Sequence, residues 1–177
     1  MSTIIDGSAS VTINSGAILG IISGTAVAST SGTSIDFTGL PSWIKRITVM
    51  FNAVSSSGTS LHQIQLGTGS TTFATSGYAG ASMNTSATAL NTTNYTSGLV
   101  NMAANAAAAV IVGQAVFTNV SGNIWVGSIN CARSDTTFTA IGSTVITLGA
   151  VLTGVRITTV NGTDTFDAGS VNLLYEG

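Results

Sequence analysis

The feature that most constrains the fold is a strict two-residue alternation between residues 44 and 54. Successive side chains of an extended chain point to opposite sides, so a repeat of two predicts a strand with two distinct faces. One face requires a hydrophobic core, and the other is mostly polar but includes Met50, which predicts contact with a partner subunit. The two faces carry, respectively, Ile47, Val49, Phe51 and Ala53, and Arg46, Thr48, Met50 and Asn52.

A turn at residues 39–42 separates this strand from a shorter one at residues 34–38. The turn contains Pro41, the only proline of the chain. Proline fixes its own φ, and it restricts the residue before it to extended geometry. The whole stretch from residue 34 to residue 54 is therefore predicted to be two strands joined by a tight turn.

The composition favours an ordered protein whose polar surface is largely uncharged. Charged residues make up 6% of the 177 residues, against roughly 25% in ordinary soluble proteins. The hydrophobic fraction of 44% is enough for a sizeable core, and serine, threonine and asparagine supply a polar surface without charge. The net charge of −2 gives no basic surface for nucleic acid. The length suits one domain with a short arm.

No apolar run approaches the about 18 residues that a membrane span needs. Residues 17–22 are apolar but too few, and residues 1–6 lack the positive start of a signal peptide. We therefore expect synthesis in a cytoplasm and no insertion into a membrane. Cys131 is the only cysteine, so we expect a small buried residue and neither a disulfide framework nor a zinc site.

The remaining pattern predicts an all-β fold. About ten short alternating runs separated by turn residues indicate an antiparallel β-sandwich, which we expect to be jelly-roll-like. Residues 1–24 are expected to form an arm or first strands that pair with their own sheet or with a neighbour, and residues 25–177 the sandwich domain. Within the arm, residues 10–14 alternate, and the apolar residues 17–22 predict a buried strand. Hairpin turns are predicted at residues 119–123 and at Asn161-Gly162. For the alanine-rich residues 101–109 we favour a strand with small side chains, at a tight contact between sheets or between subunits, over a short helix.

Residues 67–98 differ from the rest because glycine, serine, threonine and asparagine dominate there. We expect short strands at residues 71–75 and 85–90 joined by long loops, where binding residues tend to lie. Amides hydrogen-bond sugar hydroxyls, and tyrosine rings stack on sugar faces; the alternative is that the same residues pack inside strands. The candidate binding residues are Tyr78, Asn84, Asn91, Asn94 and Tyr95.

Enzymatic chemistry has little support in the sequence. A serine-histidine-aspartate site would have to use His62, the only histidine, and a single histidine in a strand is more often structural. Hydrolysis of a glycoside requires two carboxylates across a cleft, whereas the acidic residues here fall in turns or can pair with arginines. We therefore expect no enzyme activity, no cofactor and no metal site. The acidic residues considered are Asp36, Asp135, Asp164, Asp167 and Glu176.

Two segments resemble tailed-bacteriophage virion proteins. S-G-T-S-I-D-F-T-G-L-P-S-W-I-K-R-I-T-V-M-F at residues 31–51 is similar to a segment of tail-fibre and tail proteins. V-R-I-T-T-V-N-G-T-D-T-F-D-A-G-S-V-N-L-L-Y-E at residues 155–176 resembles the C-terminal end of the same proteins. The resemblance implies a virion structural protein, a homotrimer in contact with other virion proteins, that binds a host surface glycan or protein.

An alternative function follows from what precedes the two segments. In longer relatives the resembling unit ends a fibre, whereas here only a short arm and no long shaft precedes it. A capsid decoration or cement protein, which stabilises the phage head and grips the shell with residues 1–24, is therefore the second expectation.

Overall fold

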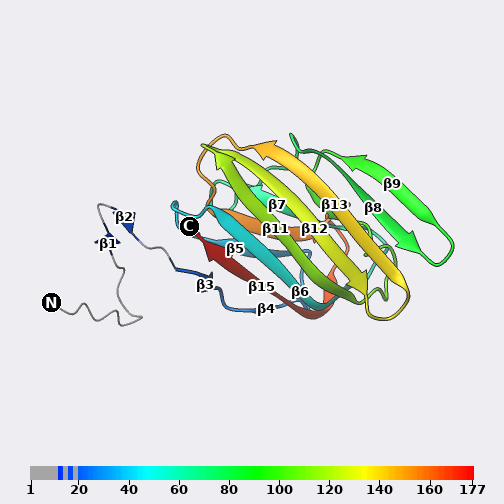
Figure 1. Cartoon of the computed structure of the whole chain (residues 1–177). Helices are drawn as coiled ribbons and strands as arrows, with labels where there is room; N and C mark the ends of the chain where they lie inside the picture. The colour runs from blue at the N-terminus through cyan, green and yellow to red at the C-terminus, as the bar shows by residue number, and fades with distance from the viewer. Residues whose placement is uncertain (1–11, 14–15, 18–19) are drawn as a thin grey trace.

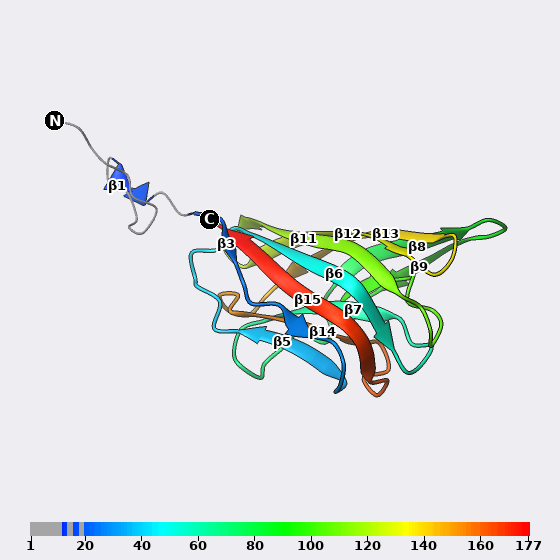
Figure 2. The same ribbon diagram turned by 90° about the horizontal axis from the view of Figure 1, so that it is seen from below.

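The computed structural model describes residues 12–13, 16–17 and 20–177 of the chain. These residues form an all-β structure in which two antiparallel sheets pack face to face (Figures 1 and 2), which confirms the β-sandwich predicted from the alternation. The described strands are, in chain order, β1 (Thr12–Ile13), β2 (Gly16–Ala17), β3 (Ile22–Ser23), β4 (Val27–Ala28), β5 (Ser34–Thr38), β6 (Arg46–Ser56), β7 (His62–Gly67), β8 (Ala79–Ser86), β9 (Leu90–Tyr95), β10 (Leu99–Asn101), β11 (Ile111–Ser121), β12 (Ile124–Arg133), β13 (Phe138–Thr147), β14 (Gly154–Thr159) and β15 (Phe166–Glu176).

The two sheets differ in size. The large sheet has the order β3-β15-β6-β11-β12-β13-β8-β9, with β4 also pairing with β15, and the small sheet has the order β10-β7-β14-β5. Figure 2 shows the small sheet lying beneath β15, β6 and β11. The hairpin of β8 and β9 lies at the far end of the large sheet from β3 (Figure 1).

The alternating strand supplies the core between the sheets, as predicted. Ile47, Val49 and Phe51 of β6 are buried. They face a small-sheet core that includes Ile64, Leu66, Val155 and Ile157. Each fully buried aliphatic or aromatic side chain stabilises the fold by about 1.5–3 kcal/mol, so the two inner faces account for the packing of the layers.

The predicted alternation of core-facing and outward-facing residues is interrupted at Ala53. Ala53 has a φ of 53°, and Gly169 beside it on β15 has a φ of 89°. The register of β15 against β6 shifts at this level, which marks a β-bulge. After the bulge Val54, Ser55 and Ser56 are all buried. The bulge bends the strand, because one extra residue opposes the partner strand there.

The two predicted hairpins have different outcomes. The turn at residues 119–123 joins the paired strands β11 and β12, and the Asn119 side chain donates to the carbonyl oxygens of Gly122 and Ile124. That hairpin is confirmed. Asn161-Gly162 instead connects β14 of the small sheet to β15 of the large sheet, so its flanking strands do not pair with each other. The Asn161 side chain accepts hydrogen bonds from Thr163 and Asp164, which makes a turn between layers.

The alanine-rich residues 101–109 are neither the strand that we favoured nor a helix. β10 ends at Asn101, whose side-chain oxygen accepts a hydrogen bond from the Ala103 backbone and starts a turn. Ala103, Ala104 and Ala109 are buried within the chain. These three side chains therefore fill space inside the sandwich, whereas Ala107 and Ala108 of the same stretch are exposed.

The end of the predicted arm pairs with its own sheet. β3 and β4 lie along β15, and the Gly24 backbone donates to the Leu173 carbonyl at 2.7 Å. The apolar run at residues 17–22 was expected to be a buried strand, but Ile21 and Ile22 are 67% and 40% exposed. Residues 18–19 of that run, and residues 1–11 and 14–15, lie outside the described residues, as does most of the alternation at residues 10–14.

Candidate binding surfaces

The large sheet exposes one broad side to solvent, which we call the outer face. In β12 the residues Trp125, Ile129 and Cys131 are buried, whereas Val126 and Ser128 between them are exposed. The same alternation in β6, β11 and β13 defines a continuous surface. One row across it, read from the register of neighbouring strands, is Leu174, Thr48, Val116, Ser128, Ser143, Ala81 and Asn94.

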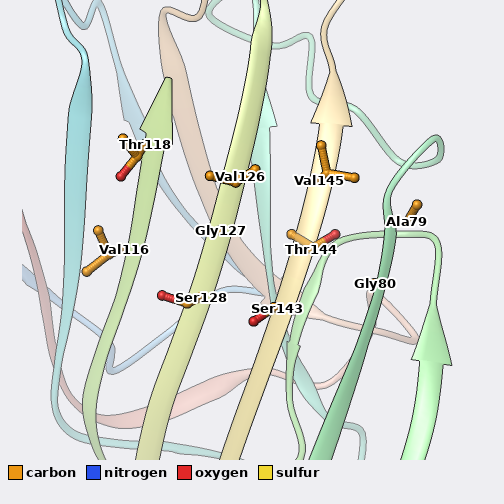
Figure 3. A pocket seen from close by; sticks show the side chains of 10 residues that line it. All are labelled: Ala79, Gly80, Val116, Thr118, Val126, Gly127, Ser128, Ser143, Thr144 and Val145. Atoms are coloured by element: carbon orange, nitrogen blue, oxygen red, sulfur yellow. The ribbon is translucent and has the colours of Figure 1, made fainter. Parts of the chain in front are cut away.

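Two shallow hollows lie next to each other on the outer face. The larger has a volume of about 500 Å³, and Figure 3 shows its valine and hydroxyl side chains on the neighbouring strands β11, β12 and β13. Val126 opposes Val145, and Ser128 opposes Ser143. The second hollow adds Ile141, which is 50% exposed, and Met83. All the side chains that line both hollows are uncharged.

The charges nearest to these hollows lie at one end of the outer face. Arg46 and Glu176 oppose each other on β6 and β15 and form a salt bridge of 3.2 Å. An uncharged surface of methyl and hydroxyl groups does not select a charged ligand. It suits a neutral, hydroxyl-rich ligand or the surface of another protein, whose contacts at the centre of an interface are also poor in charge.

Three of the five predicted binding residues lie together on β9. Asn91 and Asn94 are exposed and Tyr95 is half-buried, and β9 pairs with β8 in a regular hairpin. Asn94 and Tyr95 line a further hollow beside Gly80. The Asn91 side chain donates to the Asn84 side chain at 3.0 Å. The hairpin therefore presents Asn94 on the outer face, and Asn91 and Tyr95 on the opposite face of the same exposed strand.

The other two predicted binding residues are structural. Tyr78 is 2% exposed, and its hydroxyl oxygen accepts the Leu66 backbone N–H at 2.7 Å. Burial raises the pKa of the Tyr78 phenol to about 12. Asn84 is buried and donates to the Met102 carbonyl at 3.0 Å. Both side chains connect the β8 region to the small-sheet side of the sandwich, so neither reaches a ligand in solvent.

The long loops expected at residues 67–98 are also partly wrong. Residues 79–95 are almost entirely strand, and the expected strand at residues 85–90 contains the turn between β8 and β9. The expected strand at residues 71–75 is reduced to a single bridge between Gly67 and Phe73. Phe73 is buried under the Arg156 guanidinium, 4.2 Å from the ring centroid. Threonine favours strands, and a polar strand at a sheet edge has little apolar alternation to reveal it.

The outer face itself was not identified from the sequence, although Met50 belongs to it. The available signal was the presence of Val126, Ile141 and Val145 at the polar positions of strands whose other face is apolar. Residues of that kind on both faces of a strand indicate that both faces are covered.

Four of the groups considered for catalysis are buried or held in structural contacts, and Asp167 is exposed. His62 is 1% exposed, and its Nε2 lies 3.0 Å from the Ser56 hydroxyl, which is also buried. Cys131 is buried, and burial raises the pKa of its thiol to about 12. Asp36 pairs with Arg156 through two contacts of 2.7 and 2.8 Å. Asp164 accepts from the Ser60 backbone and the Asn161 side chain within a turn.

Within residues 12–13, 16–17 and 20–177, no cluster of three histidine, cysteine or acidic side chains has the arrangement of a metal site. The same described residues include no helix of the length and hydrophobicity that crossing a bilayer requires. No protein-family model matches the chain, and a search of curated proteins finds no significant match. The function of this chain is therefore proposed from the chemistry of its exposed surfaces.

Proposed function

We propose that the chain is a bacteriophage virion structural protein whose β-sandwich binds a host surface glycan or protein, in the manner of the end of a tail fibre. The observation that carries this proposal is the exposed, uncharged β9 strand, with Asn91, Asn94 and Tyr95, beside an equally uncharged outer face. It acts by recognition and not as an enzyme, and it is localised in the virion.

The chemistry of β9 suits a neutral glycan. An asparagine amide has two N–H donors and an acceptor oxygen that suit sugar hydroxyls, and Asn91 uses one of its donors in the bond to Asn84. The Tyr95 ring combines an apolar body with a polar end, which suits a partly wet binding site. A flat, shallow surface of this kind distributes the binding over several weak contacts, so repeated copies in one particle are needed for firm attachment.

The two segments that resemble phage proteins are neighbours in the fold. Residues 31–51 supply β5 and much of β6, and residues 155–176 supply β14 and β15. β14 pairs with β5 in the small sheet, and β15 pairs with β6 in the large sheet. The two segments thus form one layered unit, which supports treating them as a single inherited module. The jelly-roll connectivity and the homotrimer stay predictions.

Binding to intact host bacteria and to purified lipopolysaccharide tests the proposal. A double variant, Asn94→Ala with Tyr95→Ala, is expected to weaken binding by about tenfold or more, which corresponds to about 1.4 kcal/mol. Asn52→Ala is the matched control, because Asn52 is an exposed amide on β6, several strands away from β9. Equal binding by the wild type and the double variant contradicts a role for β9.

A capsid decoration protein is the second candidate, and the arm favours it. β3 and β4 are two-residue strands along β15, and Ile21, immediately before β3, is 67% exposed. In this second proposal, residues 1–20 grip a neighbouring capsomer. Deletion of residues 1–20 is then expected to abolish incorporation into particles, and unchanged occupancy rules this function out.

A further inference from the structure

The two edges of the large sheet are built differently. At one edge, β15 is covered by β3 and β4, which have two residues each. At the other edge lies β9, which runs without a register shift from Leu90 to Tyr95. Among the residues that the structure describes, β8 is the only strand that pairs with β9. The second edge of β9 therefore faces solvent (Figure 1).

The hairpin geometry identifies which backbone groups face this open edge. The Ser86 N–H donates to the Ala89 carbonyl, so these two residues form a hydrogen-bonded pair. Hydrogen-bonded and non-hydrogen-bonded pairs alternate along antiparallel strands. Asn91, Thr93 and Tyr95 thus bond to β8. The N–H and C=O groups of Leu90, Thr92 and Asn94 point to the open edge.

β9 lacks the features that usually protect an open edge. Natural proteins block such edges with charged side chains, proline or bulges. The sequence of β9 is Leu-Asn-Thr-Thr-Asn-Tyr, and its first five residues are all exposed. Leu90 is 63% exposed. An uncharged, regular and exposed strand is a ready template for another strand.

We propose that β9 pairs with β9 of a second copy of this chain, antiparallel and across a two-fold axis at Thr92. Thr92 then opposes Thr92 of the second copy, and Leu90 opposes Asn94 of the second copy. Each of these outward-facing residues exchanges both backbone hydrogen bonds with its opposite. The large sheets of the two copies become one continuous sheet.

A second copy fits this edge better than an unrelated peptide does. A two-fold contact uses the same strand on both sides, so it requires no complementary charge, and β9 carries none. The neighbouring outer-face residues Ala81 and Met83 are uncharged too, so the approach of an identical surface meets no repulsion. The pairing consumes backbone groups only. It leaves the Asn91, Asn94 and Tyr95 side chains on the faces of the sheet, and it does not depend on what they bind.

The test compares the mass in solution of the wild type with that of Thr92→Pro. Proline at position 92 removes an outward N–H and keeps the bonds to β8. The fold is therefore expected to be retained, and circular dichroism checks this. The wild-type mass by light scattering is expected to be twice that of the proline variant. The ratio is two when a monomer pairs, and also when two trimers pair through all three of their β9 strands in a closed dihedral arrangement. Thr92→Ala is the control and is expected to keep the wild-type mass.

A cross-linking experiment keeps the proposal testable if Thr92→Pro does not fold. Opposed hydrogen-bonded residues have Cα atoms about 5.5 Å apart, within the roughly 4.4–6.8 Å that a disulfide spans. Thr92→Cys is expected to form a covalent dimer on mild oxidation. Leu90→Cys is the control, because two such sites lie about 14 Å apart across the axis. Cys131 is buried and does not interfere. Equal masses for wild type and Thr92→Pro, or no dimer from Thr92→Cys, overturn the proposal.

Discussion

The Nε2 atom of His62 lies 3.0 Å from the hydroxyl oxygen of Ser56 within the buried part of the sandwich. The imidazole also packs against the Phe166 ring, with the ring centroids 5.3 Å apart. Burial lowers the pKa of His62 to about 4, and the charges of Asp164 and Asp167 act against that shift. The folded protein therefore holds a neutral histidine at neutral pH.

The free energy of unfolding is expected to fall as the pH drops from about 6.5 to about 4. In that window the unfolded chain takes up a proton on His62 and the folded chain does not, so acid favours the unfolded state. A lowering of the pKa from 6.5 to about 4 corresponds to about 3 kcal/mol. Urea unfolding of the wild type and of His62→Gln at pH 7 and pH 4.5 measures the effect. If the free energy of unfolding depends on pH in the same way in both proteins, His62 is not the cause of the loss in acid.

The contact between Arg156, Asp36 and Phe73 is expected to depend on the guanidinium group. Arg156 binds both oxygens of Asp36 and lies over the Phe73 ring. A lysine at position 156 keeps the charge and loses both the paired hydrogen bonds and the planar stacking. Arg156→Lys is expected to lower the free energy of unfolding by about 1 kcal/mol, since the group is part-exposed.

Arg46→Lys is the control for that measurement. Arg46 makes one contact of 3.2 Å to Glu176, and its side chain is 52% exposed. Arg46→Lys is expected to lower the free energy of unfolding by about 0.3 kcal/mol or less. If thermal or urea unfolding gives the same loss for both variants, the stacked, two-contact geometry of Arg156 adds no stability.

The close approach of β6 and β15 at the Ala53 bulge predicts that a side chain at position 169 destabilises the fold. Gly169 has a φ of 89°, and a Cβ on it would lie 2.2 Å from the Ala53 carbonyl oxygen. Gly39 has a similar φ of 72° but open space around it. Gly39→Ala is expected to cost about 1 kcal/mol through backbone strain alone. Gly169→Ala is expected to lower the free energy of unfolding by at least about 1 kcal/mol more than Gly39→Ala does, because backbone atoms must move. Equal unfolding midpoints would contradict the close approach of β6 and β15.

The alternation in the sequence predicted the buried residues of β6 because every second residue there meets the core. It did not predict the interruption at Ala53, since an alanine with a positive φ has no distinctive local signal, although the sequence Asp167-Ala168-Gly169 on the partner strand predicts a turn or a bulge at that level. Tyr78 and Tyr95 show the same limit for the candidate site. Both tyrosines lie in similar polar surroundings in the sequence, yet Tyr78 is held by Leu66 of the small sheet and Tyr95 lies at the sheet edge. That difference depends on which distant strands meet, which a local pattern does not encode.

The outer face is expected to contact another virion protein, and a charge at its centre tests this. Ser128 is exposed between Val116 and Ser143, so an arginine there fits without disturbing the core. Ser128→Arg is expected to change the free energy of unfolding by less than about 0.5 kcal/mol. Burying that charge in an interface is expected to lower incorporation into phage particles by more than about tenfold.

Quantitative mass spectrometry of purified particles measures that incorporation. Val160→Arg is the matched control, because Val160 is 42% exposed and lies outside the outer face, after β14 of the small sheet. Normal occupancy by Ser128→Arg shows that the outer face is free in the particle.

The most direct test of the proposed function is the position of the chain in the particle. Phage particles from bacteria that carry the gene are labelled with an antibody to this protein and imaged by electron microscopy. Label at the end of the tail is the predicted result. Label over the head supports the decoration function instead, and particles without label contradict a role in the virion.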